Sequence, residues 1–542
     1  MAATSPPTRP TAAALIPAPS PGPNRVRVTF FRRRRATPRW QPQRCSRGGK
    51  GVVEEEAERE PRPERREDDE EASVAAGPAA LGWFRLDGVA ADILTIAAPA
   101  VLALAADPIT ALVDTAFVGH IGSAELAAVG ASVSIFNLVS KLFNVPLLNV
   151  TTSFVAEQQA VDADYSGTEE RDGFSTPQEK ASEQKKILPA VSTSLALAAG
   201  IGLLEMVALL VGSGTLMNII GIPVDSPMRA PAEQFLSLRA YGAPPIIVAL
   251  AAQGAFRGFL DTKTPLYAVG AGNLLNAILD AVLIFPLGLG VSGAALATVT
   301  SEYLTAFILL WKLNNEVALF SWNIIGDGII RYLKSGGLLI GRTIAVFLTL
   351  TLSTSLATRE GPVPMAGYEI CLQVWLTISL LNDALALAGQ ALLASEYAKG
   401  NYEKARIVLY RVLQVGGMTG VALAATLFVG FESLSLLFTD DPSVLDVARS
   451  GVWFVTISQP INAIAFVADG LYYGVSDFAY AAYSTFFAGA VSSIFLLAAA
   501  PKFGLGGIWA GLTLFMSLRA IAGLWRFGSK RGPWEIIMSK TE

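Results

Sequence analysis

Two aspartates, Asp107 and Asp114, lie seven residues apart in the first long apolar run of the sequence. If this run is a helix, both carboxylates share one face, with Asp114 nearer the end at which the helix leaves the apolar layer. A charged side chain inside a bilayer is costly and usually functional, and a carboxylate buried there can take up and release a proton. We therefore expect Asp114 to carry a proton, against the alternative of a structural hydrogen bond. Asp107 precedes Pro108, so its structural alternative is stronger: it can satisfy a kinked backbone.

A second polar group lies in the fifth apolar run. Asn273, Asn276 and Asp280 follow one another at intervals of three and four residues, which places them in one stripe along a helix. Such a stripe can join helices inside lipid by hydrogen bonds, and it can also transfer protons. The two roles are compatible, and we favour the second.

Cations also lie at membrane depth, with Lys141 in the second run and Arg342 in the seventh. Facing a cavity, they would attract an anion such as a di- or tricarboxylate, whereas a transporter of cations would need acids and aromatic walls. The alternative is that they extend toward the bilayer surface. Other polar residues of the second half could line the same substrate cavity or hold a sodium ion: Asn382, Asp383, Gln390, Gln459, Asn462 and Asp469.

The elements that must position these residues are apolar helices. The chain is 52% hydrophobic and only 16% charged, against about 25% charged residues in soluble proteins. Twelve runs are long enough to cross the hydrocarbon layer. They lie near 93–118, 126–155, 187–212, 235–257, 265–287, 290–313, 331–356, 366–395, 407–430, 447–471, 478–500 and 504–527. We predict an all-α polytopic membrane protein with twelve transmembrane helices.

The twelve runs divide into two related halves of six. The segment GAFRGFLD at 254–261 returns as GLYYGVSD at 470–477, and each copy leads to a long apolar run and then a glycine-rich junction. Paired halves of this kind are typical of transporters, with the substrate site between them. We assign the repeated segments a structural role at helix ends.

Composition divides the rest of the chain. Residues 1–53 hold ten Arg, one Lys and no acid, which predicts a chloroplast transit peptide, against the alternative of a basic tail. The segments that follow are an acidic disordered linker (54–85), a first lobe (90–314) with a mobile loop (161–186), an inter-lobe linker (315–330), a second lobe (331–528) and a tail (529–542). Lys and Arg concentrate in loops on the side of the termini, which predicts that both termini face the stroma.

Several long motifs resemble the multidrug and toxic compound extrusion (MATE) family of antiporters, and in particular its plant DETOXIFICATION branch related to citrate exporters. They are DTAFVGHIGSAELAAVG at 114–130, QGAFRGFLDTKTP at 253–265, SQPINAIAFVADGLYYGVSDF at 458–478 and MSLR at 516–519. Together with the N-terminal segment, they are most similar to a chloroplast-targeted member. The resemblance covers about residues 90–534.

The resemblance implies two pseudo-symmetric six-helix lobes and a coupling carboxylate at Asp114, with a bend of the same helix at Pro99. It also implies that Asn276, Asp280 and Thr298 join Asp114 in a proton-linked network. Many relatives carry a glutamate in the seventh span, whereas residues 331–356 contain no acid. We therefore place the coupling in the first lobe.

The function implied is export of an organic solute, a citrate-like organic anion or a xenobiotic, in exchange for protons by alternating access. A lipid-linked flippase and a sodium-coupled drug exporter are the alternatives. One His, no HExxH motif and no P-loop argue against an enzyme or an ATP-driven pump, and the two cysteines, Cys45 and Cys371, exclude a cysteine-based metal site. We expect a monomer in a lipid bilayer with a small organic substrate, no nucleic-acid partner, and no cofactor besides H⁺ or Na⁺.

Overall fold

The computed structural model describes residues 88–171, 186–220, 222–319, 327–436, 438–439 and 441–539. These described residues form one compact unit. The predicted transit peptide (1–53) and acidic linker (54–85) lie outside the described residues.

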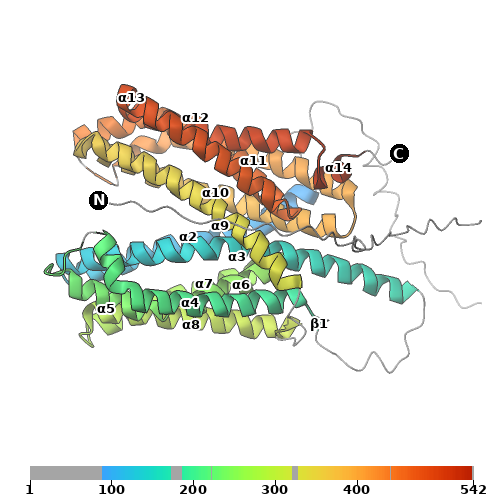
Figure 1. The fold of residues 1–542 in the computed structure, drawn as a ribbon, viewed down its shortest axis with the longest axis horizontal. Coiled ribbons are helices and arrows are strands. Elements are labelled where there is room, and N and C mark those ends of the chain that lie inside the picture. Colours follow the sequence, from blue (N-terminus) through green and yellow to red (C-terminus); the bar gives the residue numbers. More distant parts are fainter. Residues whose placement is uncertain are drawn as a thin grey trace, which may run out of the picture. The chain divides into compact units, whose positions relative to one another are not determined.

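Helices make up almost all of the described chain (Figure 1). Those of the first half are α2 (Gly88–Gly119), α3 (Ser123–Arg171), α4 (Pro189–Ile220), α5 (Arg229–Ala240), α6 (Ala243–Gly258), α7 (Lys263–Ile284) and α8 (Gly290–Glu316). Those of the second half are α9 (Asp327–Arg359), α10 (Pro362–Ala398), α11 (Tyr402–Ser435), α12 (Pro442–Gly474), α13 (Phe478–Gly528) and the short α14 (Pro533–Met538). Two short strands, β1 (Lys186–Ile187) and β2 (Val317–Ala318), pair in parallel.

The described helices account for twelve membrane spans. Ten of them are long and apolar enough to cross a membrane, and α5 with α6 forms one more span that is bent by 46°. Helix α13 contains a break at Gly504, where φ is 54° and ψ is −136°, so it is two spans joined at a kink. Glycine adopts that backbone conformation without strain because it has no Cβ atom. The prediction of an all-α protein with twelve spans, six in each half, is confirmed.

Some predicted boundaries differ from the structure. The loop expected at 161–186 begins late, because α3 continues as a helix to Arg171, and residues 172–185 lie outside the described part. A helix that leaves the membrane can continue through polar residues, so an apolar run underestimates its length. The tail expected at 529–542 contains α14, and its Trp534 is fully buried and donates to Asp477 over 3.1 Å.

The two halves share a hydrophobic core at one end of the spans only. That common cluster joins residues near the start of α2 and the end of α3, such as Ile96 and Phe154, to residues near the ends of α10 and α12, such as Leu393 and Tyr472. We call this the terminus-side end, because α2 begins there and α13 ends there. Toward the opposite end, separate clusters belong to single halves, around Leu236 in the first and around Tyr368 in the second.

Glycines of the repeated segments allow equivalent helix contacts in the two halves. A Cβ atom on Gly254 of α6 would lie 2.9 Å from the carbonyl oxygen of Leu148 in α3. A Cβ atom on Gly470 of α12 would lie 2.1 Å from the carbonyl oxygen of Ala386 in α10. Both distances are too short for real atoms, so each half needs glycine where these two helices cross.

The aspartates that end the repeated segments hold neighbouring elements, as the sequence predicted. Asp261 accepts hydrogen bonds from the backbone N–H groups of Lys263 and Thr264 at the start of α7. Asp477 accepts from Arg526 of α13 over 2.9 Å. Both positions are therefore structural.

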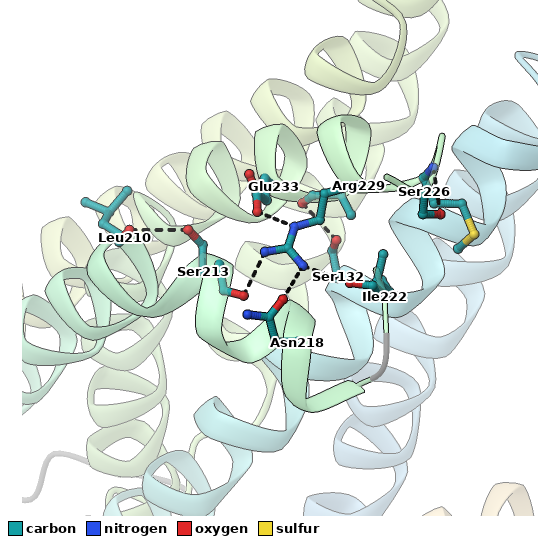
Figure 2. A network of polar contacts seen from close by, with 11 residues as sticks. Ser132, Leu210, Ser213, Asn218, Ile222, Ser226, Arg229 and Glu233 are labelled. Carbon is teal, nitrogen blue, oxygen red and sulfur yellow. Dashed lines mark hydrogen bonds and ion pairs between the residues drawn. The ribbon is translucent and has the colours of Figure 1, made fainter. Parts of the chain in front are cut away.

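An arginine holds the corner at which α4 passes into α5, within the network of polar contacts that Figure 2 shows. Arg229 of α5 pairs with Glu233 of the same helix and donates to the side chain of Asn218 and to the carbonyl oxygen of Gly214, both in α4. Arg229 also donates to the carbonyl oxygen of Ile222, which follows α4. We therefore interpret Arg229 as a structural residue that joins α4 to α5 rather than as a functional cation.

Candidate functional site

A polar cluster inside the first half joins α2, α7 and α8. With the Asn276 amide oriented to suit its neighbours, its nitrogen donates to Oδ1 of Asp114 over 2.8 Å, and its oxygen accepts from the backbone N–H of Thr298 over 3.2 Å. Asn276 is only 1% exposed. The structure thus brings together three of the residues that the sequence predicted as a network.

Asp280, the fourth predicted member, lies one helical turn after Asn276 and is fully buried. Its side chain interacts directly with that of Asp114 across the contact between α7 and α2. Neither oxygen of Asp280 accepts a hydrogen bond from any described donor. Two ionised carboxylates repel each other at close range in a medium of low dielectric, and a single proton between them would supply the missing donor.

Two further carboxylates of the first half, those of Glu205 and Glu302, pair with side chains of other helices. Arg239 of α5 pairs with Glu302 of α8 over 2.5 Å, and its guanidinium lies 4.2 Å from the centre of the Phe136 ring. Ser140 of α3 donates to the buried Glu205 of α4.

In the second half, two arginines converge on one carboxylate. Arg342 of α9 and Arg519 of α13 both donate to Oδ2 of Asp469 in α12. The exposed fractions of these three side chains are 13%, 5% and 9% respectively. We call these three residues the arginine triad.

Asp383 of α10 belongs to the electrostatic surroundings of this triad. Its side chain is exposed, although the charges of Arg342 and Arg519 from its own half and of Arg257 from the first half act on it. Charges of both halves therefore act on this one carboxylate. The structure therefore groups Arg342, Asp383 and Asp469, as predicted.

The other residues predicted for the substrate cavity have contacts outside the triad, and their role in a cavity stays a prediction. Lys141 is exposed on α3 and interacts electrostatically with Asp107 of the first half. Asn462 is buried within α12, where it accepts a hydrogen bond from Trp375 of α10 in the amide orientation that suits its neighbours. Pro99, the predicted hinge, is half-buried in α2, which continues as one helix through this residue.

Gln390 takes part in a contact between the halves. Its amide nitrogen donates to the carbonyl oxygen of Asn149 and to Oγ of Ser153, both in α3. Ser153 in turn donates to the carbonyl oxygen of Tyr473 in α12 over 2.8 Å. These hydrogen bonds lie within the shared core at the terminus-side end, and Arg331 of α9 adds an ion pair to Glu157 of α3 over 2.6 Å.

Arg519 was quoted in a sequence motif but was not assigned to the site. A signal for it existed, because an arginine within the last apolar run is as unexpected as the acids of the first. The same rule would have selected Arg239. The sequence does not show which residues these arginines contact, however, so it identifies charged residues without assigning them to a site.

Twelve spans in two six-helix halves, with buried charges inside each half and a shared core at one end only, define a membrane-transporter fold. A family model described as MatE matches residues 180–282 and 339–498. The chain is 64% identical over 451 residues to "Protein DETOXIFICATION 44, chloroplastic" of Arabidopsis thaliana, which covers 83% of this chain and 84% of the relative. "Protein DETOXIFICATION 45, chloroplastic" of the same plant is 47% identical over 82% of this chain and 79% of its own.

The chain belongs to the MATE family of membrane transporters, whose members are not enzymes. Among solved structures, a crystal structure of MATE in the bent conformation matches with a TM-score of 0.71 at 20% identity, covering 81% of this chain and 95% of the other. The fold predicted from the sequence motifs is therefore confirmed. The roles of individual residues remain predictions and are developed below.

Proposed function

We propose that this protein is a secondary active antiporter that exports an organic solute in exchange for protons by alternating access. The solute is a citrate-like organic anion or a xenobiotic. The observation that carries the proposal is the Asp114–Asp280 pair, in which a fully buried carboxyl group without a donor faces a second carboxyl group. A proton that binds there removes the repulsion between α2 and α7.

Helix α2 connects this pair to the movement of the halves. It packs against α7 in its own half and against α10 in the other half. A change in the protonation of Asp114 therefore acts on a helix that also belongs to the contact between the halves. A bend at Pro99 is the proposed hinge, because proline removes one backbone hydrogen bond of the helix.

We assign the two states of the transport cycle from the position of the shared core. In the conformation described here, the halves are held together at the terminus-side end by Ser153, Gln390 and the surrounding apolar side chains. Breaking these contacts would open the space between the halves toward the compartment that contains the termini. Substrate would enter from that compartment and leave at the opposite end.

We further propose that the protein acts as a monomer in a chloroplast membrane, with both termini in the stroma. The basic, acid-free segment 1–53 and the names of the two chloroplastic relatives support this location. The excess of Lys and Arg in loops on the side of the termini supports the orientation. The proposed proton site and the arginine triad each lie within a single chain.

The test uses the protein in proteoliposomes, with radiolabelled citrate as the probe and an acidic interior as the driving force. We expect the wild type to accumulate citrate, and Asp114→Asn to lose gradient-driven uptake while it retains exchange of external for internal citrate. The matched control is Asp107→Asn, which changes an exposed carboxylate two turns earlier on the same helix. We expect this control to retain gradient-driven uptake.

Other outcomes would contradict parts of the proposal. Gradient-driven uptake that survives in Asp114→Asn would remove this residue from the coupling site. If citrate uptake depended on a sodium gradient and not on the pH gradient, the coupling ion would be sodium rather than the proton. The absence of citrate uptake under either gradient would leave a xenobiotic as the substrate to test.

A further inference from the structure

The arginine triad carries more positive than negative charge. Arg342 and Arg519 bind the same oxygen of Asp469, and the charges of Arg257 and Asp383 act on the same group, so that three cations face two carboxylates. All three side chains of the triad are largely buried. An excess charge in such a place is unfavourable unless a further group of opposite charge can approach it.

Both arginines also have hydrogen-bonding capacity left over. The buried Nε atoms of Arg342 and Arg519 have no acceptor among the described residues. A guanidinium group presents its N–H donors in a planar fork that fits the two oxygens of a carboxylate. A second carboxylate is therefore the ligand that matches both the unbalanced charge and the unused donors.

The triad lies next to the contact that closes the terminus-side end. The guanidinium of Arg342 is 5.7 Å from the centre of the Tyr473 ring, and the carbonyl oxygen of Tyr473 accepts the hydrogen bond from Ser153 of the first half. When the halves separate at this end, Tyr473 loses that contact. Opening at this end would therefore change the surroundings of the triad.

We propose that Arg342 and Arg519 bind a carboxylate group of the transported anion, and that Asp469 occupies both guanidinium groups in the closed state. On binding, the substrate carboxylate takes one guanidinium and Asp469 keeps the other, so that each of the two guanidinium groups then faces one carboxylate. This proposal rests on the proposed function and selects an organic carboxylate within it. Arg519 and Asp469 become determinants of specificity, with Asp469 as the internal competitor of the substrate.

Binding of citrate to the purified full chain in lipid nanodiscs tests this proposal directly by isothermal titration calorimetry. Loss of a hydrogen bond between charged groups weakens binding on the order of tenfold or more, so Arg519→Gln and Arg342→Gln should raise the Kd for citrate by at least that factor. Asp469→Asn should instead lower the Kd, because it removes the competitor. A merely structural ion pair would give weaker binding in all three variants, and that result would overturn the proposal.

The matched control lies on the same helix. Arg526, seven residues after Arg519, pairs with Asp477 away from the triad, so Arg526→Gln also removes an ion pair of α13. Its Kd for citrate should equal that of the wild type. Arg519→Lys keeps the charge and tests folding, and we expect it to bind citrate more weakly than the wild type but better than Arg519→Gln.

A cationic probe separates this proposal from the proposed function. If tetraphenylphosphonium binds to the wild type and citrate does not, the carboxylate site is wrong, although proton-driven antiport can still hold for a cation. If citrate binds as predicted but its transport does not depend on the pH gradient, the proposed proton coupling is wrong and the carboxylate site at Arg342 and Arg519 is supported. Asp114→Asn should bind citrate like the wild type, because it leaves the triad intact.

Discussion

The two halves share a helical framework but hold opposite charges. In the first half, two carboxyl groups, Asp114 and Asp280, face each other beside Asn276. In the second half, two guanidinium groups, Arg342 and Arg519, face the single carboxylate of Asp469. A cluster with too much negative charge suits a proton, and a cluster with too much positive charge suits an anion. The comparison suggests that each half serves one of the two transported species.

The framework is common because its close helix crossings are common. Gly254 in α6 and Gly470 in α12 stand at corresponding places of the repeat, and each allows its helix to approach a neighbour within the same half. The side chains around these crossings are free to differ. Duplicated architecture therefore does not require duplicated chemistry.

The largest expected effect comes from Asp280→Asn in the first half. The substitution removes the second carboxyl group of the pair, so a proton is no longer needed to relieve repulsion. We expect citrate uptake driven by a pH gradient to fall to the level of protein-free liposomes, while citrate exchange persists. Retention of gradient-driven uptake would show that the acid pair is not the coupling element.

Replacement of an aspartate by asparagine should affect stability differently in the second half. Asp469→Asn leaves two buried arginines without their counter-ion, and breaking a buried ion pair in this way costs about 3–5 kcal/mol. We expect a marked loss of thermal stability in detergent, which citrate partly restores because a ligand stabilises the state that binds it. Asp280→Asn is the matched comparison and should unfold at the wild-type temperature or above. If Asp280→Asn and Asp469→Asn lost the same amount of thermal stability, the result would contradict the difference in charge that we assign to the two clusters.

A smaller effect is expected from the glycine pair. Gly470→Ala places a Cβ atom against the carbonyl oxygen of Ala386, and Gly254→Ala makes a less severe contact with Leu148. Overpacking of this kind costs about 1–3 kcal/mol, and we expect Gly470→Ala to be the less stable variant in thermal unfolding. Gly270→Ala, with no atom within 4 Å of its Cβ atom, is the control and should unfold like the wild type. If Gly254→Ala were less stable than Gly470→Ala, the result would contradict the packing described.

The smallest effect is expected where the halves meet. Ser153→Ala removes the hydrogen bonds to Tyr473 and from Gln390, which contribute about 0.5–1.5 kcal/mol each. The equilibrium should shift toward opening at the terminus-side end. Spin labels on the exposed Lys263 and Lys399 positions, one in each half, should show a larger population of long distances than in the unsubstituted labelled protein. Ser484→Ala, in which the lost hydrogen bond lies within α13, should leave that distribution unchanged.

Sequence alone predicted most of the fold, because the length of an apolar run is a local property. Each of the twelve predicted spans corresponds to a described helix, to the bent pair α5–α6 or to one arm of α13. The errors fall where a helix leaves the membrane, as at Arg171, since the hydrophobic signal ends at the bilayer and the helix does not. The short helix α14 lacks such a signal altogether, and the burial of Trp534 against α13 reveals it.

The candidate site was predicted less completely, for a reason that lies in the spans themselves. The spacing of Asn276 and Asp280 placed them on one face of a helix, and both face Asp114 as expected. Gln390 and Asn462 were named for a substrate cavity, but their side chains are engaged by other helices. Polarity within an apolar run indicates that a residue has a partner, and it does not indicate which.

The sequence by itself determined that this protein has two halves of six spans, and which charged residues lie within them. Only the tertiary structure decided that Arg519 joins Arg342 on Asp469. The physical reason is that lipid is equally apolar on all sides of a helix. An apolar run therefore does not determine the rotation or depth of its helix, whereas contacts between helices do.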